Sequence, residues 1–119
     1  MDASSFPQVE IRTADDLWDW LSTHHGRSGS VWLVTWKAAH RDRYVSNSQV
    51  LDALVAFGWV DGRKLKLDEA RVMQLISPRK QRAWAQSYRD RAARLEQEGR
   101  MMPPGRAALE AARQSAVFD

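Results

Sequence analysis

Six consecutive residues, 31–36, constrain the fold of this chain more than any other segment. They read Val-Trp-Leu-Val-Thr-Trp, and β-branched and aromatic residues in such a run are typical of a β-strand. Side chains alternate along a strand, which places Trp32, Val34 and Trp36 on one face and Val31, Leu33 and Thr35 on the other. Because both faces are largely apolar, we predict a central strand that is covered on both sides.

Helices are expected before and after this strand. Thr13 can cap a first helix, whose opening acids suit the positive end of the helix dipole, and Gly26 is a suitable stop. Residues 46–49 read Ser-Asn-Ser-Gln, which fits a capping box. The helix that follows is expected to end at Gly58, and residues 59–62 are interpreted as a turn that leaves it.

The second half of the chain is expected to add two strands and two helices. In order they are antiparallel strands at 63–67 and 71–76, a long helix at 82–98 and an Ala-rich helix near 105–115. The apolar stripe of the long helix is formed by Trp84, Tyr88, Ala92 and Leu95, which recur at helical spacing.

Length and composition favour one domain. The chain has 119 residues, of which 44% are hydrophobic, so residues 1–119 can enclose one core, with 1–12 as a partly extended lead-in. The elements follow the order α-β-α-β-β-α-α. We therefore predict an α+β fold in which about three strands form a small, mainly antiparallel sheet packed with about four helices.

Several classes of protein are excluded by what the sequence lacks. It contains no cysteine, which excludes a disulfide scaffold, a Cys-ligated zinc site and thiol chemistry. Adjacent His24 and His25 would diverge on a helix, so no metal site is expected. Neither nucleotide-binding loop nor a nucleophile elbow is present, which favours a non-enzymatic protein without a cofactor. No secretory signal or membrane-spanning run is found, so we expect a cytoplasmic protein without a membrane partner.

Positive charge is concentrated in one segment. The formal net charge of the chain is only +3. Counted by segment, however, residues 1–62 carry −3, residues 63–106 carry +7 and residues 107–119 carry −1. A basic segment of this kind favours an anionic partner, although a solvated helix face would give the same pattern.

Two of the six tryptophans lie beside this basic segment. Trp59 precedes Asp61 and Arg63, and Trp84 follows Arg79 and its neighbour Lys80. Aromatic rings next to arginine suit planar or anionic ligands and single-stranded bases. Asp61 could be an acid, a base or a ligand anchor in such a pocket, or simply a hydrogen-bonded turn residue. The other four tryptophans are interpreted as core or core-edge residues.

The chain resembles the YdeI/OmpD-associated family, often labelled bacteriocin-protection proteins. The resemblance runs over about 100 residues, from residue 18 to the last helix, and rests on the order of several short motifs. They are Trp20-Leu21, Val31-Trp-Leu33 with Lys37, Ala53-Leu54, Phe57-Gly-Trp-Val-Asp-Gly62, Leu67-Asp68, Ser77-Pro-Arg-Lys80 with Trp84, Arg94-Leu95, Glu98-Gly-Arg-Met101 and Pro104-Gly105. What it implies is a stress or antibiotic-protection role, with no established reaction or cofactor.

Two departures from the family pattern bear on function. Family members usually carry an acid early in the second helix, where this chain has Ser46-Asn-Ser48. They also show Ser-x-Trp-Ser followed closely by Asn, where this chain has Arg82-Ala-Trp-Ala85 with Tyr88. If those polar groups serve a common activity, this chain has lost or altered it.

Three functions follow as hypotheses. The first is a non-enzymatic protein that binds a small molecule or a peptide. Its ligand-binding residues would be Lys37, Trp59, Asp61, Arg63, Arg79, Lys80 and Trp84. The second is a nucleic-acid-binding module that uses the basic segment 63–106, chiefly Arg79, Lys80, Arg82, Arg89 and Arg91. The third is an enzyme of unknown reaction with Asp61 as acid or base. The oligomeric state is left open.

Overall fold

Helices and strands both contribute to the fold, as predicted. The computed structural model describes residues 6–81 and 83–114. Along the chain the elements are β1 (Gln8–Glu10), α1 (Ala14–His24), β2 (Val31–Trp36), α2 (Asn47–Phe57), β3 (Trp59–Lys66), β4 (Arg71–Pro78), α3 (Gln86–Gln97) and α4 (Pro103–Arg113). The α+β class and the four helices are therefore confirmed.

The sheet has four strands rather than three, in the order β1-β2-β4-β3. β1 runs parallel to β2, whereas the β2–β4 and β4–β3 pairs are antiparallel, so the sheet is mixed. The prediction missed β1, which lies in the expected lead-in. This short strand is held by long-range bonds, because the Trp32 amide donates to the Pro7 carbonyl at 2.8 Å and the Ile11 amide to Val34 at 3.1 Å.

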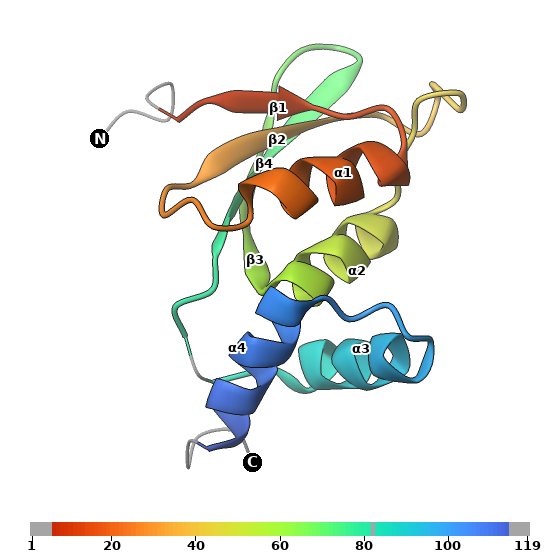
Figure 1. Ribbon diagram of the computed structural model, residues 1–119. Coiled ribbons are helices and arrows are strands. Elements are labelled where there is room, and N and C mark those ends of the chain that lie inside the picture. Colours follow the sequence, from red (N-terminus) through yellow and green to blue (C-terminus); the bar gives the residue numbers. More distant parts are fainter. Residues whose placement is uncertain (1–5, 82, 115–119) are drawn as a thin grey trace.

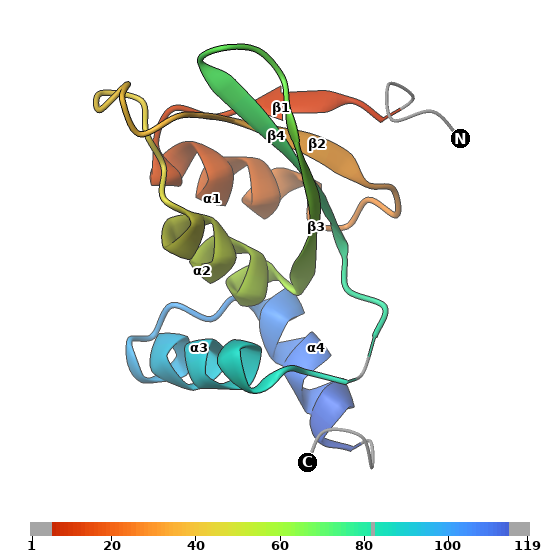
Figure 2. The same ribbon diagram turned by 180° about the vertical axis from the view of Figure 1, so that it is seen from behind.

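Helices cover one face of the sheet. α1 and α2 lie on that face, while the opposite face carries no helix among the described residues (Figure 1, Figure 2). Val31 and Leu33 of β2 join Leu17 and Leu54 of the two helices in the core. β2 is thus a central strand, and both its faces are buried as expected, since Trp32 and Val34 on the face without helices are each 1% exposed.

Local signals place the starts of the first two helices and the end of α2 where they were predicted, whereas α1 ends at His24, before the expected stop at Gly26. Thr13 and Asp16 form a capping box for α1, and Ser46 and Gln49 form one for α2. Gly58 ends α2 with φ of 75°, a left-handed conformation that favours glycine.

Two predicted boundaries are wrong, and both bear on the candidate site. β3 begins at Trp59 directly after Gly58, so residues 59–62 belong to a strand and not to a turn. α3 begins at Gln86 and not at residue 82, because Ala85 has an extended backbone. Trp84 therefore precedes the helix, and its ring is buried from the connecting segment.

α3 and α4 form a second layer below α2 (Figure 1). The amide of Met102 donates to the Ala56 carbonyl at 3.0 Å, which joins the start of α4 to the last turn of α2. An ion pair of 3.5 Å between Arg106 and Glu96 links α4 to α3. The chain reaches this layer through residues 79–85, which leave β4 and lead to α3.

Candidate binding site

Two adjoining hollows lie where β3 begins and β4 ends. The first has a volume of about 330 Å³ and is lined by Ser28, Ser30, Val60, Asp61, Gly62, Ser77, Pro78, Lys80 and Gln81. The second, of about 260 Å³, is lined by Val60, Asp61, Arg79, Gln81, Ala83, Ala85 and Tyr88. Because Val60, Asp61 and Gln81 belong to both, we treat the two hollows as one site, the Asp61 cleft.

The Asp61 carboxylate lies at the junction of the two hollows. Its position follows from the register of β3, in which Asp61 pairs with Ile76 just before a bulge in the strand. The amide of the buried Gln74 donates to Asp61 at 3.5 Å, a long hydrogen bond. No ion pair to Asp61 is found among the described residues, so its carboxylate can accept further donors.

Arg79 is held against two aromatic rings. Its guanidinium carbon lies 4.2 Å from the ring centroid of Trp84 and 5.0 Å from that of Tyr88, which are favourable cation–π distances. It donates one hydrogen bond, to the Ala83 carbonyl at 3.3 Å. In the part of the chain that the structure describes, Arg79 has no carboxylate within ion-pair distance.

Burial and the nearby carboxylate act in opposite directions on this guanidinium. Removal from water lowers the pKa of Arg79, and the charge of Asp61 partly opposes that shift. Arginine nevertheless stays protonated at neutral pH. The cleft therefore contains a guanidinium and a carboxyl group that form no ion pair with each other.

Two buried donors lie around the start of α3. Trp84 Nε1 and the Tyr88 hydroxyl are buried and have no hydrogen-bond partner among the described residues. The two rings meet edge to face, with centroids 6.5 Å apart. Ala85, which caps α3, offers no side-chain hydrogen bond, and the first turn of α3 contains no acid.

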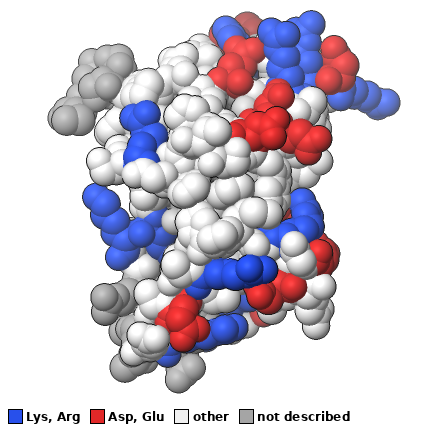
Figure 3. All heavy atoms as spheres, in the orientation of Figure 1, with Lys and Arg blue, Asp and Glu red and all other residues white. Residues whose placement is uncertain are grey.

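The predicted site residues are only partly brought together. Asp61, Arg79 and Lys80 line the cleft, and the ring of Trp84 packs against the Arg79 guanidinium. Figure 3 shows basic side chains without acidic neighbours at the left edge, level with the end of β4. The remaining three, Trp59, Arg63 and Lys37, do not line it.

Trp59 is a core residue. It is 1% exposed, and its indole N–H donates to the His25 carbonyl at 3.2 Å. Its ring packs edge to face against Trp20, with centroids 5.7 Å apart. A ligand in the cleft would not reach this ring, although Trp59 fixes the start of β3 two residues before Asp61.

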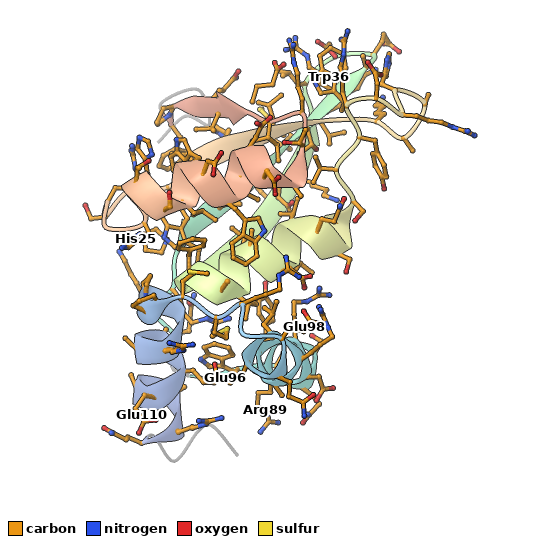
Figure 4. The ribbon with its side chains drawn as sticks, turned by 45° about the vertical axis from the view of Figure 1, so that its right-hand side comes forward. His25, Trp36, Arg89, Glu96, Glu98 and Glu110 are labelled. Carbon is orange, nitrogen blue, oxygen red and sulfur yellow. The ribbon has the colours of Figure 1, made fainter. Side chains whose placement is uncertain are left out.

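Arg63 and Lys37 point to other parts of the sheet. The Arg63 guanidinium is exposed and lies 5.9 Å from the ring centroid of Trp32. Lys37 lines a separate hollow of about 120 Å³, together with Trp36 and Tyr44. Trp36 lies at the far end of the sheet from His25 (Figure 4), so Lys37 is remote from the Asp61 cleft.

A cluster of charged residues between α2 and α3 was missed by sequence reasoning. Asp52 of α2 accepts hydrogen bonds from Arg91 at 2.6 Å and Arg94 at 2.5 Å, and Arg100 lies 3.8 Å away. An open hollow of about 600 Å³ lies over this cluster. Because the arginines and Asp52 satisfy one another, we interpret the cluster as a clamp between the two helices. A lone aspartate on a helix carries no local signal for such a role.

Metal and membrane sites find no support in residues 6–81 and 83–114. No group of three or more His, Asp or Glu side chains there is placed to hold a metal ion. No helix in the same ranges has the length and apolar character needed to cross a bilayer.

Comparison with known proteins gives one family. A family model described as a domain of unknown function (DUF8412) matches residues 9–108. No curated protein and no solved structure matches the chain. The resemblance to the YdeI/OmpD-associated family stays a prediction.

Proposed function

The chain belongs to the family of unknown function DUF8412, and from its site we propose that it is a non-enzymatic binding protein. It takes a small molecule or a peptide into the Asp61 cleft. The observation that carries this proposal is Arg79, a half-buried guanidinium without an ion pair among the described residues. A charge withdrawn from water without an opposite charge is costly unless a partner arrives.

Other arginines of the fold form ion pairs with acidic residues, as is typical of a structural role. Arg71 forms ion pairs with Glu10 and Asp68, both at 2.7 Å, and Arg91 pairs with Asp52 at 2.6 Å. Arg79 instead rests on two rings with its free N–H groups at a hollow. Such preorganisation reduces the ordering cost of binding a ligand, which supports a binding role for this residue.

A protective role in stress or antibiotic exposure is part of the proposal. It comes from the resemblance to the YdeI/OmpD-associated family and from the chemistry of the cleft. Peptide-like and aromatic compounds carry the charged and planar groups that Asp61 and Arg79 can bind. A protein that held such a compound would lower its free concentration, which is the simplest physical route to protection.

The nucleic-acid alternative is less well supported by the side-chain arrangement. Of the five residues expected to bind phosphates, Arg91 is paired with Asp52 and Arg82 lies outside the described residues. Arg94, Arg100 and Arg106 of the same basic segment are also paired with acids. Binding to DNA or RNA that weakens steeply with salt would favour this alternative.

The enzymatic alternative rests on Asp61 alone. No histidine and no second carboxylate occurs among the described residues that line the cleft. A general acid or base usually works with a second polar group that orients it or completes the proton transfer. The lining of the cleft therefore supports binding better than it supports catalysis.

A thermal-shift screen tests the proposed function. Amphipathic peptides, aromatic natural products and anionic small molecules are added to the purified chain and to two variants, Arg79→Gln and Arg63→Gln. A ligand at 100 times its Kd stabilises the folded state by about 2.7 kcal/mol. We expect this shift to disappear in Arg79→Gln and to remain in Arg63→Gln, whose side chain lies on β3 outside the cleft. No stabilising compound, or equal loss in both variants, contradicts the proposal.

A further inference from the structure

The amino terminus of α3 is open at the cleft. α1 and α2 satisfy their first amides with capping boxes, whereas Ala85 gives α3 no side-chain acceptor. The amides of Gln86 and Ser87 are therefore available to an acceptor from outside the helix, since the first amides of a helix have no partner within it. Ala85 and Tyr88 line the second hollow, so the start of α3 adjoins it, whereas Ser87 itself lines the hollow over Asp52.

Two buried donors next to this helix terminus also have no acceptor among the described residues. Trp84 is 5% exposed and its Nε1 has no partner, and the Tyr88 hydroxyl is likewise buried without one. Tyr88 lines the hollow and carries the Arg79 guanidinium over its ring at 5.0 Å. A compact anion with two acceptor oxygens matches a guanidinium fork beside free amides.

A negative group faces this set of donors. Asp61 lines the same hollow as Arg79, and its charge acts on Arg79 without an ion pair between them. A purely anionic ligand would bring its charge close to the Asp61 carboxylate, which would oppose binding. A ligand that carries an ammonium group as well as a carboxylate satisfies both charges at once.

We infer that the Asp61 cleft recognises a zwitterion, namely a free amino acid or a short peptide with both ends unblocked. Its carboxylate binds Arg79 and the open amides of α3, and its ammonium group binds Asp61. This inference rests on the proposed function, because it specifies the ligand of the same cleft. The lining of the hollow of about 260 Å³ includes the small side chains of Val60, Ala83 and Ala85, and its size fits a ligand of one to about three residues.

Isothermal titration with end-blocked dipeptides tests the inference. The probe is alanyl-tyrosine in four forms: unblocked, N-acetylated, C-amidated and blocked at both ends. We expect the unblocked form to bind, and each single block to weaken binding about tenfold or more, because each removes one charge-assisted contact.

Two variants assign the two ends of the ligand. Asp61→Asn should abolish the difference between free and acetylated forms and leave the carboxylate preference intact. Arg79→Gln should do the reverse, and Arg79→Lys should recover part of the carboxylate preference, since lysine keeps the charge but not the fork. Arg63→Gln is the matched control and should behave as the unmodified chain. Circular dichroism checks that each variant is folded.

The outcomes separate this inference from the proposed function. Binding that is indifferent to end-blocking overturns the inference and leaves the cleft as a binding site. Failure of alanyl-tyrosine to bind, while another compound from the screen binds through Arg79, also overturns the inference alone. Failure of every compound overturns both.

Discussion

Replacement of Gly105 by alanine should separate α4 from α2. A Cβ at this position would lie 2.1 Å from the Ala56 carbonyl oxygen and 2.7 Å from that of Val55. Both atoms belong to the backbone of the last turn of α2, so they cannot rotate away. α4 must therefore move outward, which also stretches the 3.0 Å hydrogen bond from Met102 to Ala56.

The expected loss of stability follows from three contributions. Overpacking costs about 1–3 kcal/mol, and contact with fixed backbone places this site at the upper end. Weakening of the Met102 hydrogen bond costs about 1 kcal/mol. Alanine in place of glycine within a helix returns about 1 kcal/mol. We therefore expect Gly105→Ala to lower the free energy of unfolding by about 3 kcal/mol.

Urea unfolding followed by tryptophan fluorescence measures this change. Gly26→Ala is the matched control, because nothing lies within 4 Å of a Cβ added there and its φ is not positive. That variant should stay within about 0.5 kcal/mol of the unmodified chain or gain slightly. Equal stability of the two variants would refute the close packing of α4 on α2.

Three further predictions concern polar contacts of the fold. Asp52→Asn should lower the free energy of unfolding by about 1–2 kcal/mol. This loss is smaller than that of a fully buried ion pair, because the arginines around Asp52 are partly exposed. Asp90→Asn is the control, and an equal effect at both sites would argue against the clamp between α2 and α3. Hydrogen bonds from the Arg71 side chain hold the pKa of Asp68 below its usual value. The stability that these hydrogen bonds confer is therefore present above the unfolded pKa of 3.8 and is lost as the pH falls through the lower pKa of the folded state. Thermal unfolding from neutral pH to about pH 2.5 should therefore show a gap between the unmodified chain and Arg71→Gln that closes in acid, and a gap independent of pH would contradict this assignment. Ser46→Ala should lower the free energy of unfolding by about 1 kcal/mol through loss of the cap of α2. Ser22→Ala on the exposed side of α1 is the control and should be nearly neutral. The reverse ranking in urea unfolding would contradict the role of Ser46.

Elements with local signals were predictable from the sequence. The caps Thr13 and Ser46 and the left-handed Gly58 act within a few residues of themselves, so their effect can be read from short patterns. The run of 31–36 likewise carries its own strand preference. These features fixed the first three predicted elements close to their observed bounds.

Elements that depend on distant partners were not predictable. β1 has three residues and exists because it pairs with β2 across more than twenty positions of sequence. The late start of α3 reflects burial of Trp84 in the core, which keeps residues 83–85 out of the helix. The helical spacing of apolar residues includes Trp84 and so predicts a longer helix. The spacing carries no information about the tertiary packing of Trp84, which makes the helix begin later.

Part of the candidate site was predictable from local sequence patterns, and part depends on distant contacts that these patterns do not show. Asp61, Arg79 and Lys80 were found from their clustering with aromatic residues, and the structure brings them to one cleft. Trp59 shares the same local pattern, yet its ring is buried against Trp20 of α1 and its N–H donates to the His25 carbonyl, long-range contacts that a local pattern does not contain. The pairing of Asp52 with arginines about forty positions away left no trace in the sequence pattern.

Amide chemical-shift mapping tests whether a zwitterionic dipeptide binds in the Asp61 cleft. The ¹⁵N-labelled chain is titrated with unblocked alanyl-tyrosine, and shifts are followed residue by residue. We expect the largest shifts at Asp61, at Arg79 and at Gln86, the first residue of α3, with little change at Tyr44 or Ser48 in the other hollows. Shifts centred on those other hollows, or no shifts at any concentration, would contradict it.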